Sequence, residues 1–217
     1  YIPDLYERGV RNFVVSDLPN DIENYNDANF LQISHPLKGL QRLAKDYRSR
    51  FDVPVIGITG SNGKTVVKEW IYQLLSPERI ITRSPRSYNS QIGVPLSVWL
   101  MNERTELGIF EAGISEMGEM EALQSIIRPT IGILTNIGGA HQENFYSTSD
   151  KCMEKLTLFK DCDVVIYDAD NELINNCVGK CLFGAREIAW SKKNPEQPLY
   201  IEGVKKGDTA TTIRYRY

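Results

Sequence analysis

A glycine-rich turn that ends in lysine and threonine is the strongest chemical feature of this sequence. The run Gly57-Ile58-Thr59-Gly60-Ser61-Asn62-Gly63-Lys64-Thr65 follows an apolar segment of strand length and opens a segment of helical period. Glycines let successive backbone N–H groups face phosphate oxygens, and a helix N-terminus adds partial positive charge. Lys64 can neutralise the β and γ phosphates, and Thr65 can ligate Mg²⁺. The sequence therefore predicts a nucleoside triphosphate site whose phosphates are held by Gly60, Ser61, Asn62, Gly63, Lys64 and Thr65.

This turn departs by one residue from the strict phosphate-loop pattern. Ile58 stands where GxxxxGK[ST] places its first glycine, and Gly57 and Gly60 flank that position. Kinases, GTPases, ATPase motors and ATP-dependent ligases all use such a loop, so the loop alone does not select a reaction. The chain has no NKxD segment that would read a guanine base. A GTPase is therefore disfavoured.

Polar groups follow two further predicted strands that should end beside the loop. The strand Leu107 to Phe110 ends in Glu111, which is either a ligand for a divalent cation or an ordinary strand-capping carboxylate. The strand from Thr130 runs into Thr135-Asn136-Ile137-Gly138-Gly139-Ala140-His141. A neutral imidazole can also bind a cation, so His141 is a second candidate ligand or a hydrogen-bonded structural residue. Parallel strands end at a common edge, and we expect these groups to meet there.

The apolar periodicity predicts an α/β fold, with a mostly parallel sheet flanked by helices. Leu37, Leu40, Leu43, Ala44 and Tyr47 have helical spacing and are expected to form one buried stripe. From residue 195 onward, short alternating segments around a Lys-Lys-Gly-Asp turn predict a C-terminal β-hairpin. Strands are expected at 12–16, 30–33, 53–59, 79–82, 107–111, 130–136 and 163–167, and helices at 36–51, 64–75, 94–101, 118–127, 149–160 and 171–178.

The composition is that of an ordinary globular protein. The 217 residues are 41% hydrophobic and 24% charged, and 25 Lys and Arg against 28 Asp and Glu give a formal charge of −3. This balance does not favour nucleic acid as a partner, and no apolar run approaches the roughly 18 residues that span a bilayer. Four cysteines without CxxC spacing are typical of reduced thiols. We therefore expect a cytoplasmic monomer that has neither nucleic acid nor membrane as its partner.

Taken in order, the motifs resemble the central domain of the Mur ligase family. The resemblance rests on TGSNGKT after a strand, NSQIGVP at 89–95, EAG at 111–113 and RPTIGILTNIGGAH at 128–141, and it is strong over roughly 53–168. The IGVP and RPxIGxxTNIGxAH segments are most similar to the members that add D-alanyl-D-alanine. The resemblance implies a P-loop Mur-ligase central domain at 36–217, incomplete at its C-terminus, and a remnant of the N-terminal uridine-nucleotide domain at 1–35. The similarity extends to the ligase part of a fusion with an alanine racemase.

The same resemblance implies ATP and Mg²⁺ as cofactors and assigns catalytic roles. Lys64 and Thr65 would hold the phosphates and magnesium, Glu111 would bind a first magnesium, and His141 a second. Lys155 best matches a lysine that the family commonly carbamylates. Burial favours the neutral amine that reacts with CO₂, and the carbamate would ligate magnesium and fix the γ phosphate.

Three further residues each have two interpretations in this pattern. Lys151, one helical turn before Lys155, is the rival carbamylation site, and a solvated surface lysine is the ordinary alternative for either. Asn136 and Asn89 match positions expected near the phosphate and the substrate, respectively. A turn-stabilising role is the alternative for both asparagines.

The implied reaction is ATP-dependent amide formation in peptidoglycan precursor synthesis, with UDP-N-acetylmuramoyl-tripeptide and D-alanyl-D-alanine as substrates. A carboxylate is a poor acceptor for an amine, so the tripeptide carboxylate would first form an acyl phosphate, whose phosphate the amine then displaces. We expect the 217-residue chain alone to make no product. The alternatives are another Mur or folylpolyglutamate-type ligase, a nucleotide-binding module without chemistry, and a small-molecule P-loop kinase.

Overall fold

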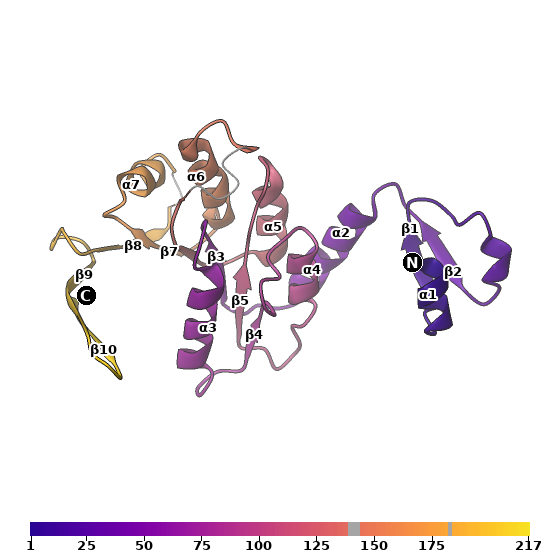
Figure 1. The fold of residues 1–217 in the computed structure, drawn as a ribbon, viewed down its shortest axis with the longest axis horizontal. Helices are drawn as coiled ribbons and strands as arrows, with labels where there is room; N and C mark the ends of the chain where they lie inside the picture. Colours follow the sequence, from indigo (N-terminus) through magenta and orange to yellow (C-terminus); the bar gives the residue numbers. More distant parts are fainter. Residues whose placement is uncertain (139–143, 182–183) are drawn as a thin grey trace.

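The structure, a computed structural model, describes residues 1–138, 144–181 and 184–217. Figure 1 shows a large twisted sheet with helices packed around it and a small two-stranded sheet at the opposite end from the C-terminus. The small sheet pairs β1 (Asn12–Val15) in parallel with β2 (Asn29–Gln32), and α1 (Ile2–Glu7) and the 3₁₀ turn η1 (Ile22–Asn24) accompany it. A cluster of Tyr6, Phe13, Tyr25 and Phe30 rings holds these elements together.

The eight-stranded sheet has the order β10-β9-β8-β7-β6-β3-β5-β4. All neighbouring strands in it are parallel except β9 and β10, which form the predicted C-terminal hairpin. The predicted class, a mostly parallel sheet flanked by helices, is therefore confirmed. The strands are β3 (Val55–Thr59), β4 (Ile81–Arg83), β5 (Leu107–Glu111), β6 (Ile131–Leu134), β7 (Val164–Asp168), β8 (Arg186–Ser191), β9 (Leu199–Lys206) and β10 (Thr211–Arg216).

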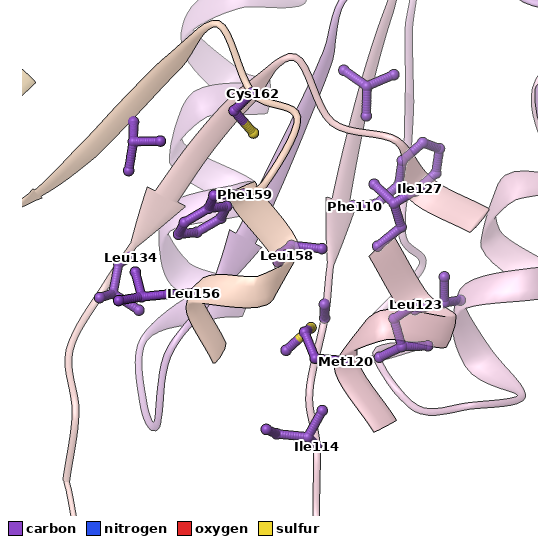
Figure 2. Close-up of a cluster of buried hydrophobic side chains, with 14 of the residues drawn as sticks. Phe110, Ile114, Met120, Leu123, Ile127, Leu134, Leu156, Leu158, Phe159 and Cys162 are labelled. Carbon is purple, nitrogen blue, oxygen red and sulfur yellow. The ribbon is translucent and has the colours of Figure 1, made fainter. Parts of the chain in front are cut away.

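Helices cover both faces of the sheet. On one face, Ile56 and Ile58 of β3 pack with apolar side chains of α3. Val55 belongs to the larger core on the other face, as the two-residue period of a strand requires. Figure 2 shows part of that core, where Phe159 and Leu158 lie near Leu134 and Phe110. The helices are α2 (Pro36–Arg48), α3 (Lys64–Leu75), α4 (Gly93–Val98), α5 (Glu119–Ile127), α6 (Thr148–Leu156), which continues into the 3₁₀ turn η3 (Thr157–Phe159), and α7 (Glu172–Val178).

The buried stripe expected on α2 is partly wrong. Leu37 and Leu43 are 41% and 58% exposed, whereas Ala44 is buried together with Arg48, which was not expected inside. The Arg48 guanidinium donates to the carbonyls of Ile127, Phe51 and Arg128. It thereby satisfies carbonyls at the C-terminal end of α5, which have no partner within the helix. Because these carbonyls need hydrogen-bond donors, the face of α2 that carries Arg48 packs against the end of α5.

Among the described residues, three elements were not expected from the sequence: α1, the 3₁₀ turn η1 and β8. β8 carries Arg186 and Glu187 at its exposed start, so its apolar alternation is short. The other strands and helices lie at their predicted places, with ends that differ by a few residues. Within the described ranges, no helix has both the length and the apolar character that crossing a membrane requires.

A glycine in β6 sets how closely η3 can approach the sheet. A methyl group at Gly132 would lie 2.7 Å from Cγ of the buried Phe159 ring. Gly132→Ala should therefore lower the free energy of unfolding by about 1–3 kcal/mol, because the core has no room for the added carbon. Urea denaturation of the purified chain measures this change. Gly203→Ala in β9 is the matched control, since its methyl would lie 3.6 Å from the flexible end of Arg214; equal losses in both variants would contradict the packing argument.

Candidate functional site

Two glycines shape the turn between β3 and α3, each for a different reason. Gly60 has φ +142°, and a methyl group there would collide with the Thr135 hydroxyl and come within 3.0 Å of the Asn136 backbone nitrogen. Gly63 has φ +81° at the N-cap of α3 and has open space around it. Gly60 therefore allows a close approach to the end of β6, while Gly63 allows the turn into the helix.

Hydrogen bonds fasten the turn to the segment that follows β6. The Ser61 N–H donates to the Asn136 carbonyl (2.8 Å), and the Asn62 N–H donates to the Asn136 side-chain oxygen (3.0 Å). The Thr135 hydroxyl donates in turn to the Asn62 carbonyl (2.6 Å). Asn136 thus contacts the loop itself, and its expected place near the phosphate stays a prediction.

Lys64 and Thr65 begin α3 with their side chains at the site. Lys64 Nζ donates to the Gly60 carbonyl at 2.9 Å. Burial lowers the pKa of Lys64, and the nearby Glu111 charge opposes that shift. The Thr65 hydroxyl donates to Oε2 of Glu111 at 3.0 Å. The end of β5 and the start of α3 therefore meet, as expected from their place at the carboxyl edge of the sheet.

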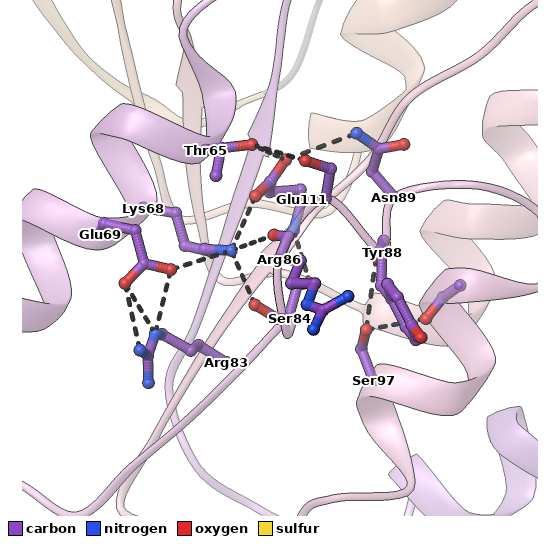
Figure 3. Close-up of polar contacts among 12 residues, drawn as sticks. Thr65, Lys68, Glu69, Arg83, Ser84, Arg86, Tyr88, Asn89, Ser97 and Glu111 are labelled. Atoms are coloured by element: carbon purple, nitrogen blue, oxygen red, sulfur yellow. Dashed lines mark hydrogen bonds and ion pairs between the residues drawn. The ribbon is translucent and has the colours of Figure 1, made fainter.

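Glu111 is fully buried, and its two carboxylate oxygens have different surroundings (Figure 3). Oε2 lies near the Thr65 hydroxyl and accepts from the Asn89 amide at 3.5 Å. Oε1 lies 2.9 Å from Nζ of Lys68, an ion pair without the alignment of a hydrogen bond. Lys68 was missed in the sequence, although its position one helical turn after Lys64 places it on the same side of α3.

Lys155 of α6 lies across a cavity of about 160 Å³ from the turn. Its side chain is nearly inaccessible, and within the described residues it makes no hydrogen bond or ion pair. Burial, and then the positive charges of Lys64 and Lys151, lower the pKa of Lys155 to about 8. Lys151 instead donates to the Gly138 carbonyl at 2.5 Å. The cavity is lined by Gly60, Ser61, Lys64, Asn89, Ser90, Gly113, Ile114, Ser115 and Lys155.

Glu154, the neighbour of Lys155, ties α6 to the start of α5. Its Oε1 accepts from the N–H groups of Gly118 (3.0 Å) and Met120 (2.9 Å). A carboxylate at a helix N-terminus satisfies N–H groups that have no partner within the helix and interacts favourably with the helix dipole. The segment that lines the cavity just before α5, residues 113–115, is thus linked through the start of α5 to the helix that carries Lys155.

The structure brings most of the predicted site residues together at one edge of the sheet. The loop, Asn89 and Lys155 line one cavity, Glu111 contacts Thr65 and Asn89, and Asn136 holds the loop. His141 lies outside the described residues. The hydroxyl of Thr65 and the carboxylate of Glu111 are hard oxygen donors that suit Mg²⁺. The described residues include no group of three or more His, Cys, Asp and Glu side chains that could hold a metal ion, so water and phosphate oxygens would complete the shell of an ion bound here.

Comparisons with known proteins identify a family and several relatives. A family model described as the Mur ligase middle domain matches residues 58–214. The UDP-N-acetylmuramoyl-tripeptide–D-alanyl-D-alanine ligase of Bacillus subtilis (strain 168) is 33% identical over 180 residues, which cover 81% of this chain and 39% of that protein. The ligase of the same name from Borreliella burgdorferi is 37% identical over 150 residues, covering 69% and 32%, respectively.

Solved structures show the same fold. The crystal structure of the MurF ligase from Thermotoga maritima in complex with ADP aligns with a TM-score of 0.80 at 21% identity, over 96% of this chain and 54% of that one. The chain spans well under half the length of the curated relatives described above.

The two glycines of the turn should differ in their tolerance of a side chain. Gly63→Ala should lower the free energy of unfolding by only roughly 1–2 kcal/mol, which is the cost of placing alanine in a left-handed backbone conformation. Its methyl group meets open space and adds no clash. Gly60→Ala should destabilise the chain further, because its methyl group would displace Thr135 and the strand end that holds the loop. Urea denaturation of both variants compares the losses. An equal or smaller loss for Gly60→Ala would disprove the close approach of loop and strand.

Proposed function

The chain belongs to the Mur ligase family through its middle domain, and from that premise we propose that it is the ATP-binding part of a ligase that joins D-alanyl-D-alanine to UDP-N-acetylmuramoyl-tripeptide. The observation that carries the proposal is the single cavity shared by the phosphate loop, Asn89 and Lys155, with Glu111 against the loop threonine. The names of the relatives supply the choice of substrates. Residues 1–35 would belong to the uridine-nucleotide domain and residues 36–217 to the central domain.

In this proposal the loop binds the triphosphate of ATP. Backbone N–H groups and Lys64 face the phosphates, and the N-terminus of α3 adds its partial charge. Thr65 and Glu111 would hold Mg²⁺, and His141 a second ion. When bound, Mg²⁺ would neutralise charge on the phosphates and so favour attack by an anion.

The chemistry proposed is transfer of the γ phosphate to the carboxylate of the tripeptide. A carboxylate oxygen attacks phosphorus in line, the bond to the β-phosphate oxygen breaks, and ADP leaves. The amine of D-alanyl-D-alanine then attacks the acyl carbon, loses a proton and displaces inorganic phosphate. Lys64 would stabilise the transferred phosphoryl group, and Asn89, which lines the cavity, would orient the substrate.

Lys155 would act as its carbamate rather than as an amine. Its location supports this, because the neutral amine reacts with CO₂ to give a carbamate and one proton, and Lys155 is buried opposite two other cations. The change replaces a third positive charge by a negative one. Lys151 is the weaker candidate, since its ammonium already donates to the Gly138 carbonyl. The carbamate would ligate magnesium and fix the γ phosphate.

The ligase proposal can be tested in a full-length protein that contains this chain. Phosphate release should require ATP, UDP-N-acetylmuramoyl-tripeptide and D-alanyl-D-alanine together, and hydroxylamine should trap the acyl phosphate as a hydroxamate. Lys64→Ala should lower kcat by about 10²-fold or more, because it removes a charge that stabilises the transferred group. Lys45→Ala, an exposed lysine on α2, is the control. A product phosphorylated on a hydroxyl would favour a kinase, and nucleotide binding without turnover would favour a binding module.

Carbamylation can be measured on the 217-residue chain by ¹³C NMR after addition of ¹³C-bicarbonate. We expect one carbamate signal that disappears in Lys155→Ala and persists in Lys160→Ala. The signal should grow from about pH 7 to about pH 9, because the neutral fraction of an amine increases as the pH rises through its pKa, here about 8. A signal that persists in Lys155→Ala but is lost in Lys151→Ala would move the modification to Lys151.

A further inference from the structure

Lys68 is a charged side chain without any solvent exposure, placed directly beneath the proposed cation site (Figure 3). Its Nζ donates to the carbonyls of Ser84 (2.7 Å) and Arg86 (2.5 Å). The same atom lies 2.9 Å from Oε1 of Glu111 and 3.2 Å from Oε1 of Glu69. The ammonium therefore makes two hydrogen bonds to carbonyls, and its charge is balanced by two carboxylates at ion-pair distance.

The first consequence concerns Glu111. A carboxylate buried without a counter-charge is strongly unfavourable, and Lys68 supplies that charge from within the protein. The 2.9 Å ion pair also favours the carboxylate orientation that turns Oε1 toward Lys68. Oε2 is thereby left on the side of the Thr65 hydroxyl and the Asn89 amide, where the phosphate loop lies.

The second consequence concerns the segment between β4 and α4. Arg86 has φ +49°, an uncommon conformation for a residue other than glycine, and its carbonyl is held by Lys68. The Ser84 hydroxyl accepts from the Glu111 N–H at 3.2 Å, and the Ser84 N–H donates to the Ile109 carbonyl at 3.0 Å, so this segment and the end of β5 are joined twice. The segment then delivers Asn89 to the cavity. One ammonium therefore positions both the carboxylate and the amide.

On the side away from Glu111, Lys68 contacts Glu69, which forms a second ion pair with Arg83. Glu69 accepts from Arg83, whose guanidinium lies 3.5 Å from the centre of the Tyr72 ring. Glu69 and Arg83 are about one-third exposed, whereas Lys68 and Glu111 are not exposed at all. The polar partners of Glu69 among the described residues are Lys68 and Arg83, so Glu69 can be changed without altering a polar contact of Glu111.

We infer that Lys68 is a positioning residue for a divalent cation bound between Thr65 and Glu111, acting through the orientation that it imposes on Glu111. This inference rests on the proposed nucleotide and magnesium site. Residues that hold a metal ligand from behind typically contribute 10- to 100-fold to metal affinity. Loss of Lys68 should therefore weaken the magnesium-dependent part of nucleotide binding and leave the loop's own contribution in place.

The test compares the affinity of the chain for the ATP analogue AMPPNP in excess MgCl₂ and in EDTA, by isothermal titration calorimetry. In Lys68→Met, the ratio of the two affinities should fall by roughly 10-fold or more, while the affinity in EDTA stays within about twofold. Glu69→Gln, which alters the outer partner of Lys68, should leave the ratio unchanged. An unchanged ratio in Lys68→Met, or equal losses in MgCl₂ and EDTA, would overturn the inference. Absence of AMPPNP binding by the wild-type chain in both conditions would overturn the proposed function itself.

Lys68→Met leaves Glu111 buried without a counter-charge, so circular dichroism must show that the variant folds. Where it does not fold, the pair Lys68→Met with Glu111→Gln removes both charges and is compared with Glu111→Gln alone. If Lys68 acts through Glu111, the two proteins should have the same affinity ratio. A further fall of the ratio in the double variant would overturn the inference.

Discussion

The parallel pairing of β3 with β6 on one side and with β5 on the other is the constraint on which the site depends. The chain forms β3, adds β4 and β5 on one side, and then crosses to place β6 on the other. The carboxyl ends of three strands therefore converge where the strand order reverses, which is where α/β sheets bind ligands. β3 supplies the phosphate loop, β5 supplies Glu111, and β6 leads into Asn136. No long-range loop is needed to bring these groups together.

The site then has to accommodate several charges away from water. The charges of Lys68 and Glu111 balance each other in an ion pair, and the carboxylate of Glu154 accepts from N–H groups at the start of α5. Lys155 differs from these residues, because its charge faces two other cations and burial lowers its pKa. A buried charge that is paired with an opposite charge stabilises the structure around it. A buried charge that is surrounded by like charges marks a place where an anionic ligand or a chemical modification would lower the electrostatic cost.

The sequence supports the parts of this account that depend on local chemistry. The phosphate loop is readable because glycine, lysine and threonine stand together between a strand and a helix, and the family resemblance is confirmed by the match to residues 58–214. Glu111 could be placed because it ends an apolar strand. Lys68 could not, because a lysine in an amphipathic helix ordinarily faces water, and only the tertiary fold sets a carboxylate beside it. The burial of Arg48 was missed for the same reason. Its partners are the carbonyls of Ile127, at the end of α5, and of Phe51, just after α2, and only the fold brings the first of them close.

The attachment of Glu154 to the start of α5 has a mechanical consequence. One carboxylate on α6 accepts from two N–H groups at the start of α5, so the cavity wall before α5 should move together with the helix that carries Lys155. A molecule that enters meets a surface already assembled, and little conformational entropy is lost in shaping it on arrival. The affinity for a ligand would then depend on its shape complementarity to a preorganised cavity wall, rather than on how far the protein can rearrange around it.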